Sequence, residues 1–225
     1  MYYSSYIVMI PFLIFTMYAQ RKVKTTFKKY LQVANRKGLT GYEVARTILD
    51  RNGLTNVNIE RANRGMLSDH YDPTKRVVRL SNEVYSGRTM SSISVAAHEV
   101  GHAIQHSKAY MPLTFRSMLA PVANIASKSV FGIIFAGMIF GINGLLDIGI
   151  IVFSVVILFQ VVTLPVEFNA SSRALVELRE HGLVYDDEIV SSKRVLDAAA
   201  LTYVAAVAAS VGQLIRLLLI RGSRD

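Results

Sequence analysis

The sequence has no cysteine, and only 18% of its 225 residues carry a charge. The absence of cysteine excludes a disulfide framework. The scarcity of charge is uneven, because hydrophobic residues make up 52% of the chain and are collected into long uncharged runs. Runs of this kind are typical of helices in a bilayer, so we expect a mainly α-helical membrane protein with transmembrane helices.

The first uncharged run covers residues 1–19 and is followed at once by the basic stretch QRKVKTTFKK. A cleaved signal peptide carries its positive charges before the apolar part, which is the reverse order. The pattern therefore predicts that residues 1–20 form a retained transmembrane anchor. Pro11, in the middle of this run, is tolerated better in a membrane helix than in a soluble one.

Two further runs, at about 125–142 and 145–166, are separated by GINGLLD and predict a transmembrane hairpin over residues 125–166. The last run, residues 198–220, contains a single charge, Arg216, and is rich in alanine in its first half. It predicts a C-terminal membrane-associated helix. A lipid-facing span and a helix packed within the bundle are both open for it.

Basic side chains follow the first run directly, whereas the first ten residues have no charge and the hairpin turn has only Asp147. This bias predicts a multi-pass protein of the cell membrane with its N-terminus outside and residues 21 to about 124 in the cytoplasm. The net charge of +9 also raises nucleic acid as a partner. We predict none, because the cations cluster beside the spans, where anionic lipid heads account for them, and no nucleic-acid motif accompanies them. These cations are Arg21, Lys22, Lys24, Lys28 and Lys29.

Two soluble pieces remain, residues 21–118 and 167–197, and we expect them to form an α+β part with a small sheet. In TGYEVARTILDRNG, Thr40 caps a helix that ends at Gly53. Its apolar face consists of Val44, Ala45, Ile48 and Leu49. The stretches NVNIER and KRVVRLS predict strands, with the turn-rich RGMLSDHYDPT between them. A further helix is predicted from Thr89 or Ser91 to His106.

That helix contains the pattern H-E-x-x-H at His98, Glu99 and His102. Residues four apart project from one face of a helix, so both imidazoles can approach one metal while Glu99 is aimed at a water on it. A chance occurrence of the pattern in this composition has a probability of roughly one in a hundred. The alternative is a solvated polar face. The flanking residues are apolar almost all round the helix, and buried ionisable groups need partners or a metal, which favours a zinc site.

His106 continues the same row, but eight residues along a helix separate it from His98 by about 12 Å. It is therefore predicted to lie beside the metal ligands or to face substrate. The metzincin pattern H-E-x-x-H-x-x-G-x-x-H fails, because Gln105 and Lys108 occupy the Gly and His positions.

A catalytic zinc takes three protein ligands and one open position. If the hairpin crosses the membrane twice, the chain returns to the side of His102 at about Val166, and the next residue is Glu167. Glu167 is then a candidate third ligand at the start of a helix. An acidic residue at a helix N-terminus is also stabilised without a metal, and Glu177 and Glu180 are competing candidates.

Three stretches together resemble the YugP-like neutral zinc metallopeptidases, which are membrane proteins related in motif to the glutamate-type zincins. These stretches are SDHYDPTKRVVRLSNEVYSGR, AAHEVGHAIQH and TLPVEFNASSRAL. The resemblance covers most of the chain, from YAQRKVK to the final Ala-rich helix. It implies a membrane zinc peptidase with a zincin-like catalytic part.

The resemblance implies that His98, His102 and Glu167 of this chain are the zinc ligands and that Glu99 is the catalytic acid/base. The glutamate-zincin pattern E-x-x-x-D expects an aspartate where this chain has Ser171. The partner of the zinc-bound histidines is therefore open between Ser171 and Asn169.

In such a site, zinc lowers the pKa of its open-position water towards about 7, and Glu99 accepts the proton as the water attacks a peptide carbonyl. The oxyanion needs a further donor, for which His70, His181 and Tyr203 are candidates. A strand before the H-E-x-x-H helix can also offer an open edge to an extended peptide substrate, and an ordinary protected edge strand is the equal alternative. The residues of this predicted edge are Lys75, Arg76, Val77, Val78, Arg79 and Leu80.

Two functions follow from these observations. One is a zinc metalloendopeptidase with the lipid bilayer and a protein or peptide substrate as partners, whose catalytic region comprises residues 21–118 and 167–197. The other is a non-catalytic membrane scaffold with a structural metal. The intact Glu99 favours the peptidase, since a structural site has no use for a base.

Overall fold

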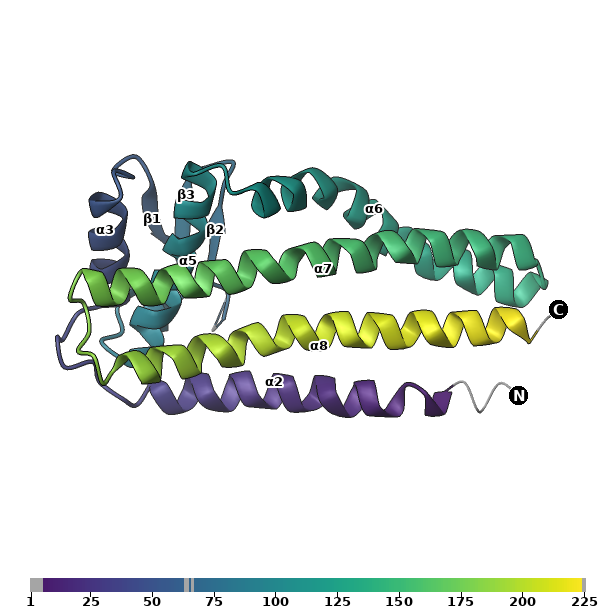
Figure 1. Ribbon diagram of the computed structural model, residues 1–225, viewed down its shortest axis with the longest axis horizontal. Coiled ribbons are helices and arrows are strands. Elements are labelled where there is room, and N and C mark those ends of the chain that lie inside the picture. Colours follow the sequence, from purple (N-terminus) through teal and green to yellow (C-terminus); the bar gives the residue numbers. More distant parts are fainter. Residues whose placement is uncertain (1–5, 63–64, 66, 224–225) are drawn as a thin grey trace. The chain divides into compact units, whose positions relative to one another are not determined.

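The computed structural model describes residues 6–62, 65 and 67–223 and is mainly helical (Figure 1). Four long helices, α2 (Ile10–Tyr30), α6 (Met111–Phe140), α7 (Asn143–Glu180) and α8 (Ile189–Gly222), accompany three shorter ones. The shorter helices are α3 (Gly41–Arg51), α4 (Asn82–Tyr85) and α5 (Met90–Ser107). A three-stranded sheet is formed by β1 (Asn58–Arg61), β2 (His70–Asp72) and β3 (Val77–Leu80). This confirms the predicted fold class of a helical protein with a small sheet.

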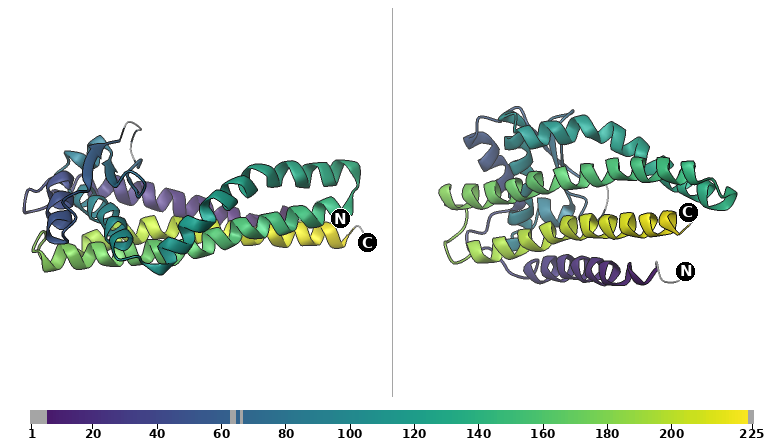
Figure 2. Two further views of the ribbon diagram at one scale, coloured as in Figure 1. Left: turned by 90° about the horizontal axis from the view of Figure 1, so that it is seen from above. Right: turned by 45° about the vertical axis from the view of Figure 1, so that its right-hand side comes forward.

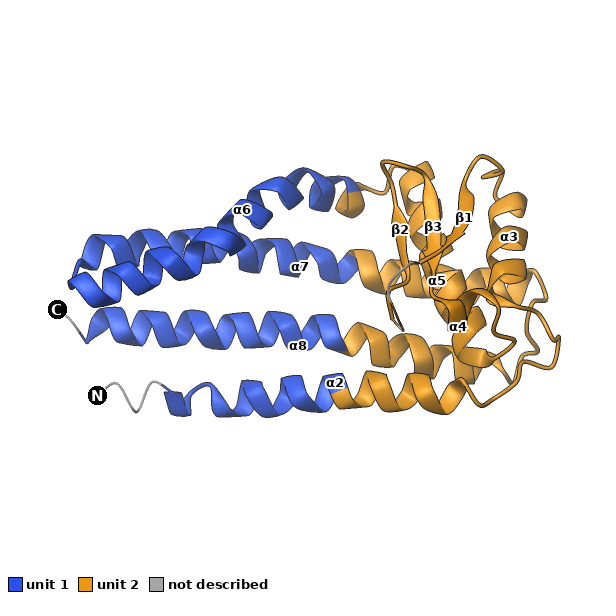
Figure 3. Ribbon diagram, turned by 180° about the vertical axis from the view of Figure 1, so that it is seen from behind, with its two compact units in different colours: residues 1–20, 114–165, 202–225 blue, residues 21–113, 166–201 orange. Residues whose placement is uncertain are grey.

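The chain divides into two compact units (Figure 3). Unit 1 comprises residues 1–20, 114–165 and 202–225, and unit 2 comprises residues 21–113 and 166–201. The helices α2, α6, α7 and α8 contribute to both units, and α3, α4, α5 and the sheet belong to unit 2. Each unit is described on its own below.

Three helices of the described chain, α6, α7 and α8, are long and apolar enough to cross a membrane. In unit 1 the second half of α6 and the first half of α7 run side by side, joined by a turn at Gly141, whose φ is +68° (Figure 2). Their contact is close, because a Cβ added to Gly149 would lie 2.6 Å from Cγ1 of Ile134. Arg221 of α8 donates to Asp147 of α7 at 2.8 Å within the same unit.

The hairpin helices extend beyond their predicted bounds. Helix α6 begins at Met111 rather than near residue 125 and runs through Pro121, and α7 runs through Pro165 to Glu180. The prediction of a new helix starting near Glu167 is therefore wrong. The reason is that Pro165 interrupts a hydrogen bond without ending the helix, and this is tolerated where neighbouring helices satisfy the backbone.

Helix α2 is not among the three candidate spans, since the basic residues after residue 20 occupy its second half. Residues 1–5 of the predicted anchor lie outside the described residues. The anchor over residues 1–20 stays a prediction.

The core of unit 2 is formed by α3 packing on α5. Thr40 caps α3 through a capping box with Glu43, as the sequence indicates for its N-terminus, and Gly53 follows the helix with a φ of +71°. Thr89 caps α5, whose side chains are buried almost all round. The largest fully buried side chains at this core include Ile48, Leu49, Ile93, Ile104 and Leu178.

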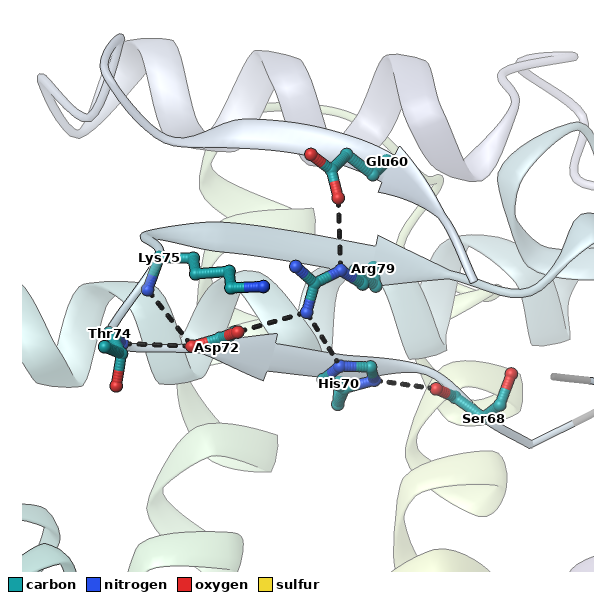
Figure 4. Close-up of polar contacts among 7 residues, drawn as sticks. All are labelled: Glu60, Ser68, His70, Asp72, Thr74, Lys75 and Arg79. Atoms are coloured by element: carbon teal, nitrogen blue, oxygen red, sulfur yellow. Dashed lines mark hydrogen bonds and ion pairs between the residues drawn. The ribbon is translucent and has the colours of Figure 1, made fainter. Parts of the chain in front are cut away.

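The sheet has the order β1-β3-β2, with β1 parallel and β2 antiparallel to β3. The predicted substrate edge at residues 75–80 is therefore wrong, because β3 is hydrogen-bonded on both sides. Lys75 and Arg76 lie in the turn before β3, where the Asp72 carboxylate accepts the Thr74 and Lys75 backbone N–H groups (Figure 4). An additional strand, β2, occupies part of the stretch predicted to be a turn.

Arg79 links the polar strand β2 to the other two strands. Its guanidinium donates to Glu60 of β1 and Asp72 of β2, both at 3.1 Å, and lies 3.3 Å from His70 Nε2 (Figure 4). One arginine on the central strand thus connects the side chains of all three strands.

Candidate metal centre

Helix α5 presents His98 and His102 one turn apart in unit 2. Their ring centroids are 4.8 Å apart and the rings are nearly perpendicular, at 85°. Both side chains are largely buried, with 14% and 12% of their surface exposed. Glu99, next to His98, is also buried.

Helix α7 brings Glu167 to the two imidazoles. Its Oε2 lies 3.3 Å from His98 Nε2 and 3.6 Å from His102 Nε2, and the carboxylate is 4% exposed. Glu167 lies well inside α7 and far from its first residue, so the alternative of a carboxylate at a helix N-terminus does not apply. Of the competing acids, Glu177 instead accepts from Asn52 and contacts His181.

The approach of α5 to α7 depends on the absence of a side chain at Gly101. A Cβ built there would lie 2.7 Å from the carbonyl oxygen of Ala170, which is closer than real Cβ atoms come. Gly101 stands between the two histidine positions, and Ala170 follows Glu167 by one helical turn. Close backbone contact at this point allows the short Glu167 side chain to reach both rings.

A polar network behind the rings fixes the tautomer of His102. Gln105 is fully buried and its amide nitrogen donates to the Val166 carbonyl at 2.8 Å and to Asn169 Oδ1 at 3.0 Å. With both donors used, Gln105 Oε1 accepts from His102 Nδ1 at 3.0 Å. In the neutral ring, His102 Nε2 then carries no proton and its lone pair faces Glu167, as a metal ligand requires.

Ser171 is the partner of the other histidine. Its hydroxyl lies 3.2 Å from His98 Nδ1. The position at which glutamate zincins carry an aspartate is therefore filled by a neutral group that contacts the predicted ligand. Asn169 contacts Gln105 and accepts from Arg173 at 2.7 Å, so its effect reaches His102 through Gln105.

The cluster fits a zinc ion. Its three ligand atoms all lie within 4.8 Å of one another, and Glu167 Oε2 is buried without a hydrogen-bond partner. Ligands at about 2.0–2.1 Å from a tetrahedral zinc are about 3.3 Å apart, which is close to the two distances from Glu167. A buried carboxylate oxygen without a donor is costly unless a cation satisfies it.

Charge at the cluster also favours a cation. Burial lowers the pKa of the His102 imidazole, but the neighbouring carboxylates of Glu167 and Glu99 outweigh burial and hold this pKa above its ordinary value. The two carboxylates thus create a negative potential at the rings, which stabilises a bound metal ion in the same way as a proton.

Asp69 is a further acid near Glu99. Burial, together with the charge of Glu99, raises the pKa of Asp69 to about 6, although hydrogen bonds from Ser81 act in the opposite direction. Those bonds come from the Ser81 backbone N–H at 2.7 Å and its hydroxyl at 3.1 Å. Asp69 therefore joins the segment before β2 to the end of β3.

The other predicted residues take different places. His106 is exposed and its Nδ1 lies 2.9 Å from the Tyr71 hydroxyl. His70 contacts Ser68 and Arg79 (Figure 4). His181 follows the end of α7, about 20 Å along the helix from Glu167, and contacts Glu177. Tyr203 belongs to unit 1. Neither His70 nor His181 has a contact with the three ligands among the described interactions.

The sequence did not predict a role at the site for Gln105, Gly101 or Tyr71. A signal existed for Gln105, since it follows His102 by three residues on the apolar helix and a buried amide needs partners. Tyr71 gave no such signal, because its strand is polar and short and depends on pairing with β3.

Comparisons with known proteins agree with this site. The family described as "Putative neutral zinc metallopeptidase" matches residues 5–222. The chain is 50% identical over 203 residues to a protein of Bacillus subtilis (strain 168) named "Putative membrane protease YugP", covering 90% of each chain. No solved structure matches the chain. The match over nearly the whole length, together with the two histidines and one glutamate that converge in unit 2, shows that the chain belongs to this family of membrane zinc metallopeptidases.

Proposed function

We propose that the protein is an endopeptidase that hydrolyses peptide bonds of proteins at the cytoplasmic membrane surface, with Glu99 as general base and acid. The observation that carries the proposal is the convergence of His98, His102 and Glu167, with Glu99 buried beside them. A structural zinc site takes four protein ligands, whereas this cluster, within the described chain, offers three. Three ligands leave a position for substrate chemistry.

When bound, zinc supplies a Lewis acid that polarises a peptide carbonyl and brings the pKa of water towards about 7. Glu99 takes the proton from the attacking water and delivers it to the leaving amine. Its place in α5, directly after His98, holds the carboxylate in a constant relation to the metal ligands. Gln105 and Ser171 orient the two imidazoles.

The developing oxyanion requires a donor in addition to the metal. Tyr71 and His106 are joined by a hydrogen bond of 2.9 Å, and His106 lies one helical turn after His102. This pair takes the role for which the sequence suggested His70, His181 or Tyr203. It also ties β2, an outer strand of the sheet, to the helix that carries the site.

The membrane-surface location rests on the chain around the site. The 19 residues between Asp147 and Glu167 carry no charge, so the third ligand directly follows an apolar segment of α7. The basic residues between Arg21 and Lys29 favour the cytoplasmic side for unit 2.

The catalytic role is tested by purifying Glu99→Gln and wild type in detergent and measuring zinc content and casein cleavage. We expect equal zinc and a loss of activity of about 10²–10⁴-fold, because the base is removed while the ligands remain. Glu83→Gln, a change at an exposed carboxylate of α4, is the matched control and retains both properties. Unchanged cleavage by Glu99→Gln would favour a scaffold with a structural metal.

The natural absence of cysteine allows a direct test of sidedness. In Lys37→Cys the thiol lies on an exposed loop of unit 2, and in Asn143→Cys it lies at the hairpin turn. A membrane-impermeant maleimide is expected to label the second variant in intact cells and the first only after permeabilisation. The reverse pattern would place the site outside.

A further inference from the structure

A cavity of about 640 Å³ lies between α2 and α8. None of the proposed metal ligands lines it. The parts of both helices that belong to unit 2 run side by side there (Figures 1 and 3). On α2 the lining includes Lys22, Thr26 and Lys29, spaced at three or four residues so that they share one face. On α8 the lining includes Arg194 and Asp197.

The charge of this cavity is not balanced. Three cations, Lys22, Lys29 and Arg194, face a single carboxylate, Asp197. That carboxylate is already paired with Lys193, at 2.6 Å. Neither Lys22 nor Lys29 has an ion pair with a carboxylate in the part of the chain that the structure describes. The cavity therefore holds positive charge that an anion can neutralise.

Neutral donors stand beside the cations. The Tyr30 hydroxyl lies 3.4 Å from Arg194 Nη1, which ties α2 to α8, and Thr26 contributes a second hydroxyl to the lining. Two ammonium groups, a guanidinium and hydroxyls form a donor set that suits the oxygens of a phosphate group.

An apolar surface adjoins these donors. Ala198 and Leu201 of α8 also line the cavity, and residues 198–215 carry no charged side chain. On α2 the residues before Arg21 are likewise uncharged. Both walls of the cavity thus continue along the chain into uncharged segments, as expected where a phosphate group and acyl chains bind together.

We infer that this cavity binds the phosphate headgroup of an anionic phospholipid. The inference does not depend on the peptidase activity, since none of the lining residues is a metal ligand or Glu99. The headgroup lies between α2 and α8, and binding neutralises the charge of Lys22 and Lys29. A bound lipid thereby stabilises the pairing of two helices that are far apart in the sequence.

The test uses the full-length protein in a neutral detergent, with short-chain phosphatidylglycerol as the probe and phosphatidylcholine of the same chain length as the reference. Affinity is measured by native mass spectrometry. Lys22→Gln combined with Lys29→Gln is expected to weaken phosphatidylglycerol binding about thirtyfold, since each cation near a lipid surface contributes about fivefold. Lys24→Gln combined with Lys28→Gln removes the same charge from the same helix outside the cavity, and the expected loss is below about threefold.

Equal losses in the two double variants would overturn the inference, because they would indicate general surface attraction. Equal binding of both lipids by wild type would overturn it as well. Competition by inorganic phosphate at the same concentration as the lipid would instead identify a site for a free anion. Thr26→Glu, which places a carboxylate in the cavity, is a second variant expected to abolish the preference for phosphatidylglycerol. Zinc content and the thermal transition report folding of every variant.

Discussion

The two units treat apolar side chains in opposite ways. In unit 2, Ile48, Leu49 and Ile93 are 0% exposed, whereas in unit 1 Phe131 and Phe135 are 66% and 62% exposed. Within the most apolar window of each candidate span, only 17–28% of the residues are buried inside the protein. Exposed apolar surface of this extent is unfavourable in water. Unit 1 is therefore built for a bilayer, and unit 2 carries its own core.

The two units also differ in where their polar residues lie. Unit 2 buries a connected set of ionisable and amide groups at the candidate metal centre, and its apolar core holds them in place. Unit 1 has a pair at Arg221 and Asp147 near the ends of its helices. The buried ionisable groups of this protein therefore lie where protein side chains, rather than lipid, surround them.

The largest expected effect comes from removing Glu167, the proposed third zinc ligand in unit 2. Glu167→Gln should lower zinc affinity by roughly a hundredfold or more and abolish cleavage, since a neutral amide is a poor zinc ligand. Zinc titration with a competing chelator measures this. Glu177→Gln, ten residues further along α7, is the matched control and should bind zinc as wild type does. Equal zinc affinity of the two variants would contradict the assignment.

Whether the exposed surface of unit 1 faces lipid is tested by introducing one charged side chain in each unit. Phe135→Lys puts an ammonium group on the lipid-facing surface of α6, at a cost of about 2.5–3.5 kcal/mol near the centre of a span. Val190→Lys changes a residue of unit 2 that is 53% exposed. We expect a marked drop in membrane-inserted protein for the first variant and little for the second, as measured by alkaline extraction. Similar yields would show that α6 does not face lipid.

The close approach of α5 and α7 is expected to be sensitive to one methyl group. Gly101→Ala places a Cβ 2.7 Å from the Ala170 backbone oxygen, which cannot move as a side chain can. A loss of about 1–3 kcal/mol in the free energy of unfolding should follow, with weaker zinc binding. Gly132→Ala in unit 1 meets no atom within 4 Å and serves as the control for thermal denaturation. A stable Gly101→Ala with normal zinc content would mean that the helices separate freely.

Substitutions of Ser171, the neutral partner of His98, are expected both to raise and to lower the zinc affinity. Ser171→Asp should raise zinc affinity by about tenfold, because a carboxylate next to His98 Nδ1 makes the ring a better donor to metal. Ser171→Ala should lower the affinity by up to about tenfold. Ser172→Asp, at the next position of α7, is the control, since its hydroxyl bonds to the Phe168 carbonyl instead. Equal effects of the two aspartates would point to general charge.

The smallest effect concerns pH and Asp69 in unit 2. The pKa of this carboxyl is about 6 in the folded protein, against an ordinary 3.8, because burial disfavours its charge. The folded state therefore keeps a proton that the unfolded state releases, and stability falls as pH rises from about 4 to about 6. Asp69→Asn does not titrate. Its thermal midpoint relative to wild type should rise by a few degrees between about pH 4.5 and about pH 7.5. A constant difference would contradict the raised pKa.

Features set by neighbours along the chain were predictable. Thr40 and Glu43 form their capping box within one turn, and the H-E-x-x-H spacing places His98 and His102 on one helical face whatever surrounds them. The long uncharged runs likewise indicated candidate spans, because helix length and hydropathy are local properties. The ends of these helices nevertheless differ from the predicted ones, because α6 and α7 continue through Pro121 and Pro165.

Features that depend on contacts between distant segments could not be derived from local sequence patterns. Chain topology alone left Glu167, Glu177 and Glu180 open as ligands, and the family resemblance was what pointed to Glu167. In the structure, the packing of α5 on α7 at Gly101 brings Glu167 to the rings. The partners of Gln105, the pairing of β2 with β3 and the central place of β3 have the same origin. Such contacts depend on the free energy of packing the whole of unit 2. Local preference thus determined the spacing of the two imidazoles and of Glu99, the proposed base, on one helix. Long-range packing determined which carboxylate lies beside the imidazoles, because that contact joins α5 to α7.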